Sequence, residues 1–284
     1  IHHLSSPLPY RRSNDQTPEQ FCDFLVKEFE DKIRELGSEN VAAFIAEPVL
    51  ASGGCIVPPE GYYKKIYDVC KKNEIIFIAD EVVTGFGRLG HFFSSEEVFG
   101  VVPDIITCAK GITSGYLPLG AVLFSDKLIG DLKHDSSLFF HGYTYSGHPA
   151  CCAAALKNIE ILKRDKILEH VREIEPYFFE KLNTLYELPI VGDIRGKGLM
   201  AGIECVINKN SKEALILDKA IGSRIDEESI KLGLIIRPLY HICVLSPALI
   251  ITKNQIDDLT EKLYLAISNT IDQLQKEGLW SSQK

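Results

Sequence analysis

Residues 75–80 read Ile-Ile-Phe-Ile-Ala-Asp, a short uninterrupted apolar run that ends in a carboxylate. Two similar runs lie on either side of it along the chain. Val41–Ala46 is followed by Glu47, and Ile105–Ala109 is followed by Lys110. Apolar runs of this length, each ending at a polar residue, are consistent with strands that are buried on both faces.

Helical periodicity separates these runs. Apolar residues recur every three or four positions across 18–36, with Thr17 as the predicted N-cap and Gly37 as the predicted stop. A second helix is predicted near 61–73, and a further short apolar run at 121–124 adds a fourth strand. Strands that alternate with helices indicate βαβ units and a buried, mainly parallel sheet, so we predict an α/β fold.

The sequence changes in character near residue 150. Two long helical stretches, 149–164 and 166–186, begin there. Beyond them we predict a smaller α+β unit, with strands at 190–194, 199–206, 234–237 and 242–246 and helices near 213–232 and 253–275. The expected domains are therefore a large domain over 1–150 and a small C-terminal domain over 151–284.

Composition argues against several classes of partner. A net charge of -8 disfavours nucleic acid, which usually leaves a basic footprint on its binding protein. No tract reaches the roughly 18 to 20 apolar residues of a membrane helix. The eight cysteines form no CxxC pair, and neither they nor the histidines have the spacing of metal ligands. We expect a cytoplasmic protein with small-molecule partners.

Three charged residues follow the predicted strands, namely Glu47, Asp80 and Lys110. In open α/β sheets the carboxyl ends of the strands line the ligand crevice, so two carboxylates and one amine are expected to meet there. A structural ion pair between Asp80 and Lys110 explains the same pattern. The local sequence alone leaves both interpretations open.

A competing motif lies between two of these strands. Residues 85–90, Gly-Phe-Gly-Arg-Leu-Gly, match the GxGxxG fingerprint of dinucleotide-binding proteins. The residues that follow are not an apolar helix, and the next predicted strand ends in Lys110 where a ribose-binding acid is expected. We therefore interpret 85–90 as a tight turn.

Three blocks of sequence carry a family resemblance. They are IADEVVTGFGR at 78–88, PDIITCAKG at 103–111 and HGYTYSGHP at 141–149. Together, and in this order, they resemble the class III aminotransferases, which are fold-type-I pyridoxal-phosphate enzymes. The resemblance implies a large domain with a mainly parallel sheet and a smaller α+β domain. It also implies pyridoxal 5'-phosphate as the cofactor.

The resemblance also assigns roles to residues. Lys110 would hold the cofactor as a Schiff base and later move the substrate proton, and Asp80 would pair with the pyridine nitrogen. Val82 would pack on the ring, and Glu47 matches the Glu-Pro of the family's cofactor pocket. Thr144 would reach the cofactor phosphate of a neighbouring subunit, which requires a homodimer. Alternatively, Thr144 only closes a local Gly-rich turn.

Two further positions concern the substrate. Ser52 stands where family members that use glutamate carry a gating glutamate, which favours transfer from an ω-amino acid or amine to pyruvate. Arg237 matches the arginine that binds the substrate carboxylate. Alternatively, Arg237 is an ordinary cation at the end of a strand and has no role in substrate binding. Alternatives are an aminomutase or a biotin-pathway transaminase of the same fold, or a noncatalytic fragment. The family's N-terminal part, with its phosphate-cradling loop, has no counterpart in these 284 residues.

Overall fold

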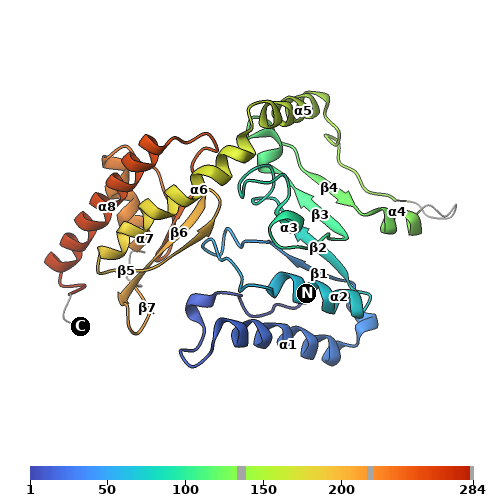
Figure 1. Ribbon diagram of the computed structural model, residues 1–284, viewed down its shortest axis with the longest axis horizontal. Coiled ribbons are helices and arrows are strands. Elements are labelled where there is room, and N and C mark those ends of the chain that lie inside the picture. The colour runs from blue at the N-terminus through green and yellow to red at the C-terminus, as the bar shows by residue number, and fades with distance from the viewer. Residues whose placement is uncertain (133–138, 216–220, 282–284) are drawn as a thin grey trace. The chain divides into compact units, whose positions relative to one another are not determined.

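The computed structural model describes residues 1–132, 139–215 and 221–281, which form two compact units (Figure 1). The first unit comprises 1–48 and 58–168. The second comprises 49–57 together with the chain from Glu169 onward. The segment 49–57 thus packs with the second unit, although both of its neighbours in sequence belong to the first.

One four-stranded sheet forms the centre of the first unit. Its strands, in spatial order, are β1 (Ala43–Ala46), β2 (Ile76–Asp80), β3 (Ile105–Cys108) and β4 (Ala121–Phe124). β1, β2 and β3 are parallel, as the alternation of runs and helices predicted. β4 runs antiparallel to β3, because residues 109–120 contain no α-helix that could return the chain to the far end of the sheet.

Helices cover this sheet and connect its strands. They are α1 (Pro18–Leu36), α2 (Tyr62–Lys72), α3 (Ser94–Glu97), α4 (Asp126–Leu132) and α5 (Pro149–Arg164), with 3-10 turns η1 (Pro9–Arg11), η2 (Ser38–Asn40) and η3 (Lys110–Thr113). Thr17 caps α1 by accepting a hydrogen bond from the backbone N–H of Gln20, and Gly37 ends the helix at a φ of 81°. Both predicted ends of this helix are confirmed.

The core of the first unit lies on one face of the sheet. α1 and α2 contribute Leu25 and Ile66, which pack in one cluster with Phe77 and Ala79 of β2. Because successive residues of a strand point to opposite faces, Asp80 points away from this core while its neighbour Glu81 points toward it.

The second unit is built on an antiparallel sheet. Its strands are β5 (Val191–Lys197), β6 (Met200–Asn208), β7 (Glu213–Ala214), β8 (Arg237–Leu239) and β9 (Ile242–Leu245), in the order β5-β6-β9-β8 with β7 paired to β6. Its helices are α6 (Ile167–Asn183), η4 (Thr184–Glu187), α7 (Ile221–Lys231) and α8 (Lys253–Lys276). The α+β character expected here is confirmed.

Two local predictions in this unit need correction. The stretch 213–232 is not one helix, because Ala214 pairs with Val206 in β7 and the helix spans 221–231; residues 216–220 lie outside the description. The strand predicted at 234–237 begins only at Arg237. The residues before Arg237 instead form the C-terminal cap of α7, since the Leu234 N–H donates to the Ser229 carbonyl oxygen.

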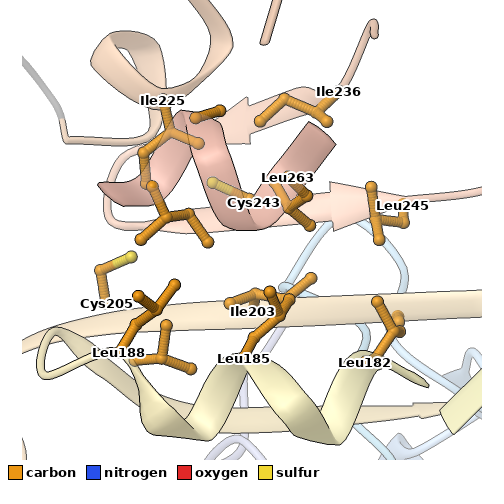
Figure 2. Close-up of a cluster of buried hydrophobic side chains, with 14 of the residues drawn as sticks. Leu182, Leu185, Leu188, Ile203, Cys205, Ile225, Ile236, Cys243, Leu245 and Leu263 are labelled. Carbon is orange, nitrogen blue, oxygen red and sulfur yellow. The ribbon is translucent and has the colours of Figure 1, made fainter. Parts of the chain in front are cut away.

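One face of the second sheet carries the larger hydrophobic core. Ile203 and Cys205 of β6 and Cys243 and Leu245 of β9 project to this face. Figure 2 shows them packed with side chains of the helices, among them Leu182, Leu185, Leu188, Ile225 and Leu263. The opposite face of the sheet carries polar residues instead, including Asp193, Arg195 and Glu204.

The boundary between the units differs from the division at residue 150 that the sequence suggested. Contacts within the chain separate the units after Leu168. α5 stays with the first unit because the Asn158 side-chain amide donates to the carbonyl oxygens of Gly111 and Ile112, at 2.9 and 3.1 Å. The functional domains 1–150 and 151–284 stay a prediction. Within the described ranges, no helix is both long and apolar enough to cross a membrane.

Candidate active site

The carboxyl ends of three parallel strands bring the predicted site residues to one edge of the first sheet. Ala46 is the register partner of Ala79, and Asp80 is the partner of Thr107. Glu47 therefore follows β1 at the level of Asp80, the last residue of β2. Lys110 begins η3, two residues after the end of β3. The carboxylate of Asp80 is half-buried, whereas the Lys110 side chain is exposed.

The segment that follows Asp80 is held by a residue that the sequence did not single out. Glu81 is fully buried, and its carboxylate accepts hydrogen bonds from the hydroxyls of Thr84 (2.7 Å) and Ser94 (2.8 Å). It also accepts one from the backbone N–H of Ser95, at 2.7 Å. The only sequence signal was a second acid beside Asp80, and the strand pleat decides which acid faces the protein interior.

Glu81 closes a loop whose centre is the GxGxxG segment. The Phe86 N–H donates to the Phe92 carbonyl oxygen at 2.8 Å, and the Gly87 N–H donates to the His91 carbonyl oxygen at 2.9 Å. Residues 85–90 are thus a reverse turn, and the next helix begins only at Ser94. A dinucleotide fingerprint opens directly into a helix whose N-terminus binds the pyrophosphate, and this segment does not.

Asp80 itself orients the start of the same loop. Its Oδ1 accepts a hydrogen bond of 3.1 Å from the backbone N–H of Val82. Val82 is half-buried and leads into the turn. Beneath this edge, burial raises the pKa of the Tyr63 hydroxyl well above its usual range, and the negative charges of Glu81 and Asp80 act in the same direction. The buried Tyr63 hydroxyl therefore stays neutral at this end of the sheet.

Gly111, the residue after Lys110, packs closely against the loop that follows Asp80. A Cβ added at the adjacent Gly111 would lie 2.9 Å from the Cβ of Phe86 and 3.1 Å from the carbonyl oxygen of Gly85. The backbone of Lys110 has a φ of 39°, a left-handed conformation that is unusual for a residue with a side chain. Such backbone strain is concentrated at functional sites, where the surrounding packing maintains it.

The side chain of Lys110 borders a hollow in the surface of the first unit. The hollow has a volume of about 360 Å³ and is lined by Lys110, Thr113, Gly115, Tyr116, Leu117, Pro118 and Leu119. Asn158 supports η3 from the other side through Gly111 and Ile112. The amine is therefore accessible to a small molecule while its backbone is held in place.

The remaining predicted residues lie elsewhere. Thr144 is exposed in the turn before α5, and this turn is closed by Ser146, whose hydroxyl accepts from the Tyr143 N–H at 3.0 Å. The side-chain hydrogen bond that closes this turn is therefore made by Ser146 and not by Thr144. Arg237 is exposed at the start of β8, in the second unit. Among the described residues, no three histidine, cysteine or acidic side chains are grouped as metal ligands.

An accessible amine beside a carboxylate suits one kind of chemistry. A primary amine forms a covalent imine with a carbonyl carbon. A neighbouring carboxylate stabilises a cationic ring nitrogen, and its partial burial reduces the screening of that interaction by water. The residue types present at this edge therefore fit pyridoxal 5'-phosphate, and the separate roles of Lys110, Asp80 and Val82 stay predictions.

Comparison with known proteins agrees with this chemistry. Residues 1–267 match the family model described as Aminotransferase class-III. The chain is 43% identical over 260 residues to a putrescine–pyruvate aminotransferase of Pseudomonas aeruginosa, covering 91% of this chain and 56% of that protein. It is 40% identical to a probable gamma-aminobutyrate transaminase 3 of Oryza sativa subsp. indica, covering 92% and 51%. The chain spans about half the length of these relatives.

Solved structures extend the likeness to the fold. An (S)-enantioselective omega-transaminase from Thermomicrobium roseum superposes with a TM-score of 0.91 at 42% identity, covering 95% of this chain and 60% of that one. The PMP-bound form of an aminotransferase from Vibrio fluvialis gives a TM-score of 0.89 at 36% identity, covering 95% and 60%. The α/β fold expected from the sequence is confirmed as that of these transaminases.

Proposed function

The chain belongs to the class III aminotransferases, a family that uses pyridoxal phosphate, and on this basis we propose that the protein moves an amino group from an ω-amino acid or amine to a 2-oxo acid such as pyruvate. The observation that carries the proposal is the placement of Asp80 and Lys110 at the carboxyl ends of neighbouring parallel strands. The Lys110 amine is exposed and borders a hollow, which a purely structural ion pair between Lys110 and Asp80 does not require.

Each residue of the edge has a separate task in this proposal. When bound, pyridoxal phosphate supplies a carbonyl carbon for amines and a ring that accepts electrons. The Nζ of Lys110 holds the cofactor and later carries the proton that leaves the substrate carbon. The carboxylate of Asp80 keeps the ring nitrogen protonated. Val82 contacts one face of the ring, and Glu47 completes the edge beside Asp80.

The substrates are inferred from the second unit and from the relatives. The names of two relatives include a pyruvate-dependent amine transfer and an omega-transaminase. Ser52 stands where family members that use glutamate carry a gating glutamate, which supports a pyruvate-linked transfer. Arg237 is exposed and, as a planar guanidinium, suits bidentate binding of a carboxylate. We assign to it the carboxylate of the amino acceptor or of the ω-amino acid.

A homodimer is part of the proposal because of an apolar surface around Thr144. Large side chains close to Thr144 in the chain are strongly exposed, namely Phe139, Phe140, Tyr143 and Tyr145. Soluble monomers seldom leave such a group of aromatic side chains in water. A second copy would cover it, and Thr144 would then donate to the cofactor phosphate of that copy.

All eight cysteines are free, which supports a cytoplasmic location.

Substituting Lys110→Ala in the full-length protein tests the assignment. We expect the visible absorbance of the bound cofactor and the transamination to pyruvate to be lost, because the substitution removes the amine that we assign to the cofactor. Lys72→Ala, an exposed lysine of α2, is the control and should change neither. Survival of both signals in the Lys110 variant would show that the assignment is wrong.

Two further measurements separate the alternatives. Pyruvate, 2-oxoglutarate and S-adenosylmethionine are compared as exchange partners, since a biotin-pathway transaminase would prefer the last and an aminomutase would need none. Titration of the 284-residue chain with pyridoxal phosphate then asks whether this chain alone develops the chromophore. Without a chromophore, and without transamination by the full-length protein, the noncatalytic alternative would hold.

A further inference from the structure

The segment Val49–Val57, which we name the strap, belongs to the second unit although it connects β1 to α2 of the first. Its two arms are joined by an isolated antiparallel bridge between Leu50 and Ile56, with reciprocal backbone hydrogen bonds of 2.9 and 3.0 Å. Its tip is folded back, because the N–H groups of Gly54 and Cys55 both donate to the Ala51 carbonyl oxygen. The strap is thus an ordered loop with its own hydrogen bonds.

The tip of the strap lies directly on the second sheet. The Gly54 carbonyl oxygen accepts a hydrogen bond of 2.8 Å from Nε of Arg195 on β5. A Cβ added at Gly202 of β6 would lie 2.4 Å from the same oxygen. A Cβ added at Gly54 would lie 2.7 Å from Cδ1 of Ile242 on β9. The strap therefore contacts three strands, and its backbone approaches β6 at a distance that only a glycine at position 202 permits.

Two carboxylates fix the side chain of Arg195. Its side chain is only 9% exposed, and its Nη1 donates to Asp193 at 2.8 Å and to Glu204 at 2.6 Å. Glu204 is 1% exposed, and Nε2 of His241 lies 3.4 Å from its other oxygen. Charge-assisted hydrogen bonds of this kind fix the orientation of a guanidinium. Arg195 thus presents its Nε to the strap with little freedom to move.

Arg237 lies in the same transverse row of the sheet as Arg195. Arg195 pairs with Gly202, Gly202 pairs with Val244, and Val244 pairs with Arg237. Directly paired residues in antiparallel strands project to the same face. Three strand spacings separate the two arginines, which is about 14 Å. The strap tip, with Ser52, and Arg237 thus share one face of a single unit.

We propose that Arg195 is a positioning residue that seats the strap on the second sheet and so fixes Ser52 relative to Arg237 on the face that binds the substrate carboxylate. The proposal rests on the function proposed above. Arg195 does not touch the reacting atoms in this role and acts through the strap.

Hydrogen exchange of the full-length protein tests the seating without reference to activity. We expect peptides covering 49–57 to lose protection in Arg195→Met, and Arg195→Lys to restore part of it, because an ammonium can still reach the Gly54 oxygen. Gly202→Ala displaces the strap by contact while leaving Arg195, Asp193 and Glu204 paired, so it decides the matter if Arg195→Met does not fold. Unchanged protection in Gly202→Ala would overturn the proposal.

Steady-state kinetics test the consequence of the seating. We expect Gly202→Ala to raise the KM for pyruvate by about tenfold while kcat changes by less than about threefold, the signature of lost uniform binding. The KM for an amine without a carboxylate should not change. Gly130→Ala on α4, where an added methyl meets nothing, is the control.

The outcomes separate the two proposals. A released strap with an unchanged KM for pyruvate would refute the positioning role of Arg195. If the wild-type protein transfers no amino group to any acceptor, the proposed function is wrong, and the exchange data alone then decide whether Arg195 seats the strap.

Discussion

The carboxylate of Glu81 accepts a hydrogen bond of 2.8 Å from the hydroxyl of Ser94, thirteen residues further along the chain. This bond closes the loop that carries Val82 and the reverse turn at 85–90. Because Glu81 points into the protein, its neighbour Asp80 points to the opposite side, at the edge that also carries Lys110. One buried acid therefore holds the loop, while the adjacent acid lies at the edge that we propose binds the cofactor.

Replacing Glu81 should destabilise the first unit. Glu81→Ala would leave the Thr84 and Ser94 hydroxyls and the Ser95 N–H without their acceptor inside the protein. We expect the free energy of unfolding to fall by about 2–4 kcal/mol, the typical cost of buried donors left unpaired. Chemical denaturation measures it. Glu96→Ala, at an exposed position of α3, should change stability by less than about 0.5 kcal/mol; an equal loss in both variants would contradict this role.

A methyl group at Gly111 should displace Lys110. The added Cβ would lie 2.9 Å from the Cβ of Phe86, so either the turn or η3 has to move. We expect Gly111→Ala to weaken pyridoxal phosphate binding by about tenfold or more, because reacting groups tolerate little misplacement. Spectroscopic titration of the full-length protein measures it. Gly120→Ala meets only ordinary contacts, 3.5 Å or longer, and should bind as the wild type does.

Arg237 should distinguish substrates with a carboxylate from those without one. Arg237→Met removes a planar donor pair, so we expect kcat/KM for pyruvate to fall by about tenfold or more, while that for a simple amine changes little. Arg237→Lys keeps the charge but loses the bidentate geometry and should give an intermediate value. Equal losses for both substrate classes would argue for a structural role of this exposed strand-end residue.

Glu228 of α7 should contribute a pH-dependent part of stability. Hydrogen bonds from Lys231 and then from Gln273 lower the pKa of this buried carboxyl below its usual value. The unfolded chain then binds the proton more readily, so the contribution is complete above the unfolded pKa of about 4.3 and is lost as pH falls through the lower folded pKa.

The test of this contribution is denaturation across a pH series. Glu228→Gln should flatten the decline of the unfolding free energy below about pH 4.5. The exposed Glu261→Gln on α8 is the control and should leave the slope as it is. A wild-type slope in the Glu228 variant would contradict the assigned pKa shift.

Much of the first unit followed from local pattern. The apolar runs located β1, β2 and β3. The expected burial of both faces of these strands is not seen in this chain, since Ala43 and Ile45 of β1 are exposed. Thr17 and Gly37 bounded α1 because capping depends on a few adjacent residues. The turn at 85–90 was distinguished from a nucleotide loop by what followed it in the chain. These features depend on interactions over short sequence distances.

Other features could not be read from local pattern. β4 has the composition of any buried strand, and only its pairing with β3 shows that it is antiparallel. The two residues of β7 are too few to produce a periodic signal. The part of Glu81 depends on Ser94 and Ser95, which are brought to it by the reverse turn. The membership of the strap in the second unit depends on its contacts with Arg195, far along the chain.

The sequence by itself determined where the strands of the first sheet lie, where charged residues follow them, and, through three blocks of residues, which family the chain belongs to. Tertiary structure alone decided that Gly111, next to Lys110, packs against the turn after Asp80, and that the Arg195 side chain donates a hydrogen bond to Gly54, 141 residues earlier in the chain. The reason is physical. Apolar patterns and helix caps are set by residues near one another in sequence, whereas the close approach of Gly111 to Phe86, or of Gly54 to Gly202, exists only once the strands have paired.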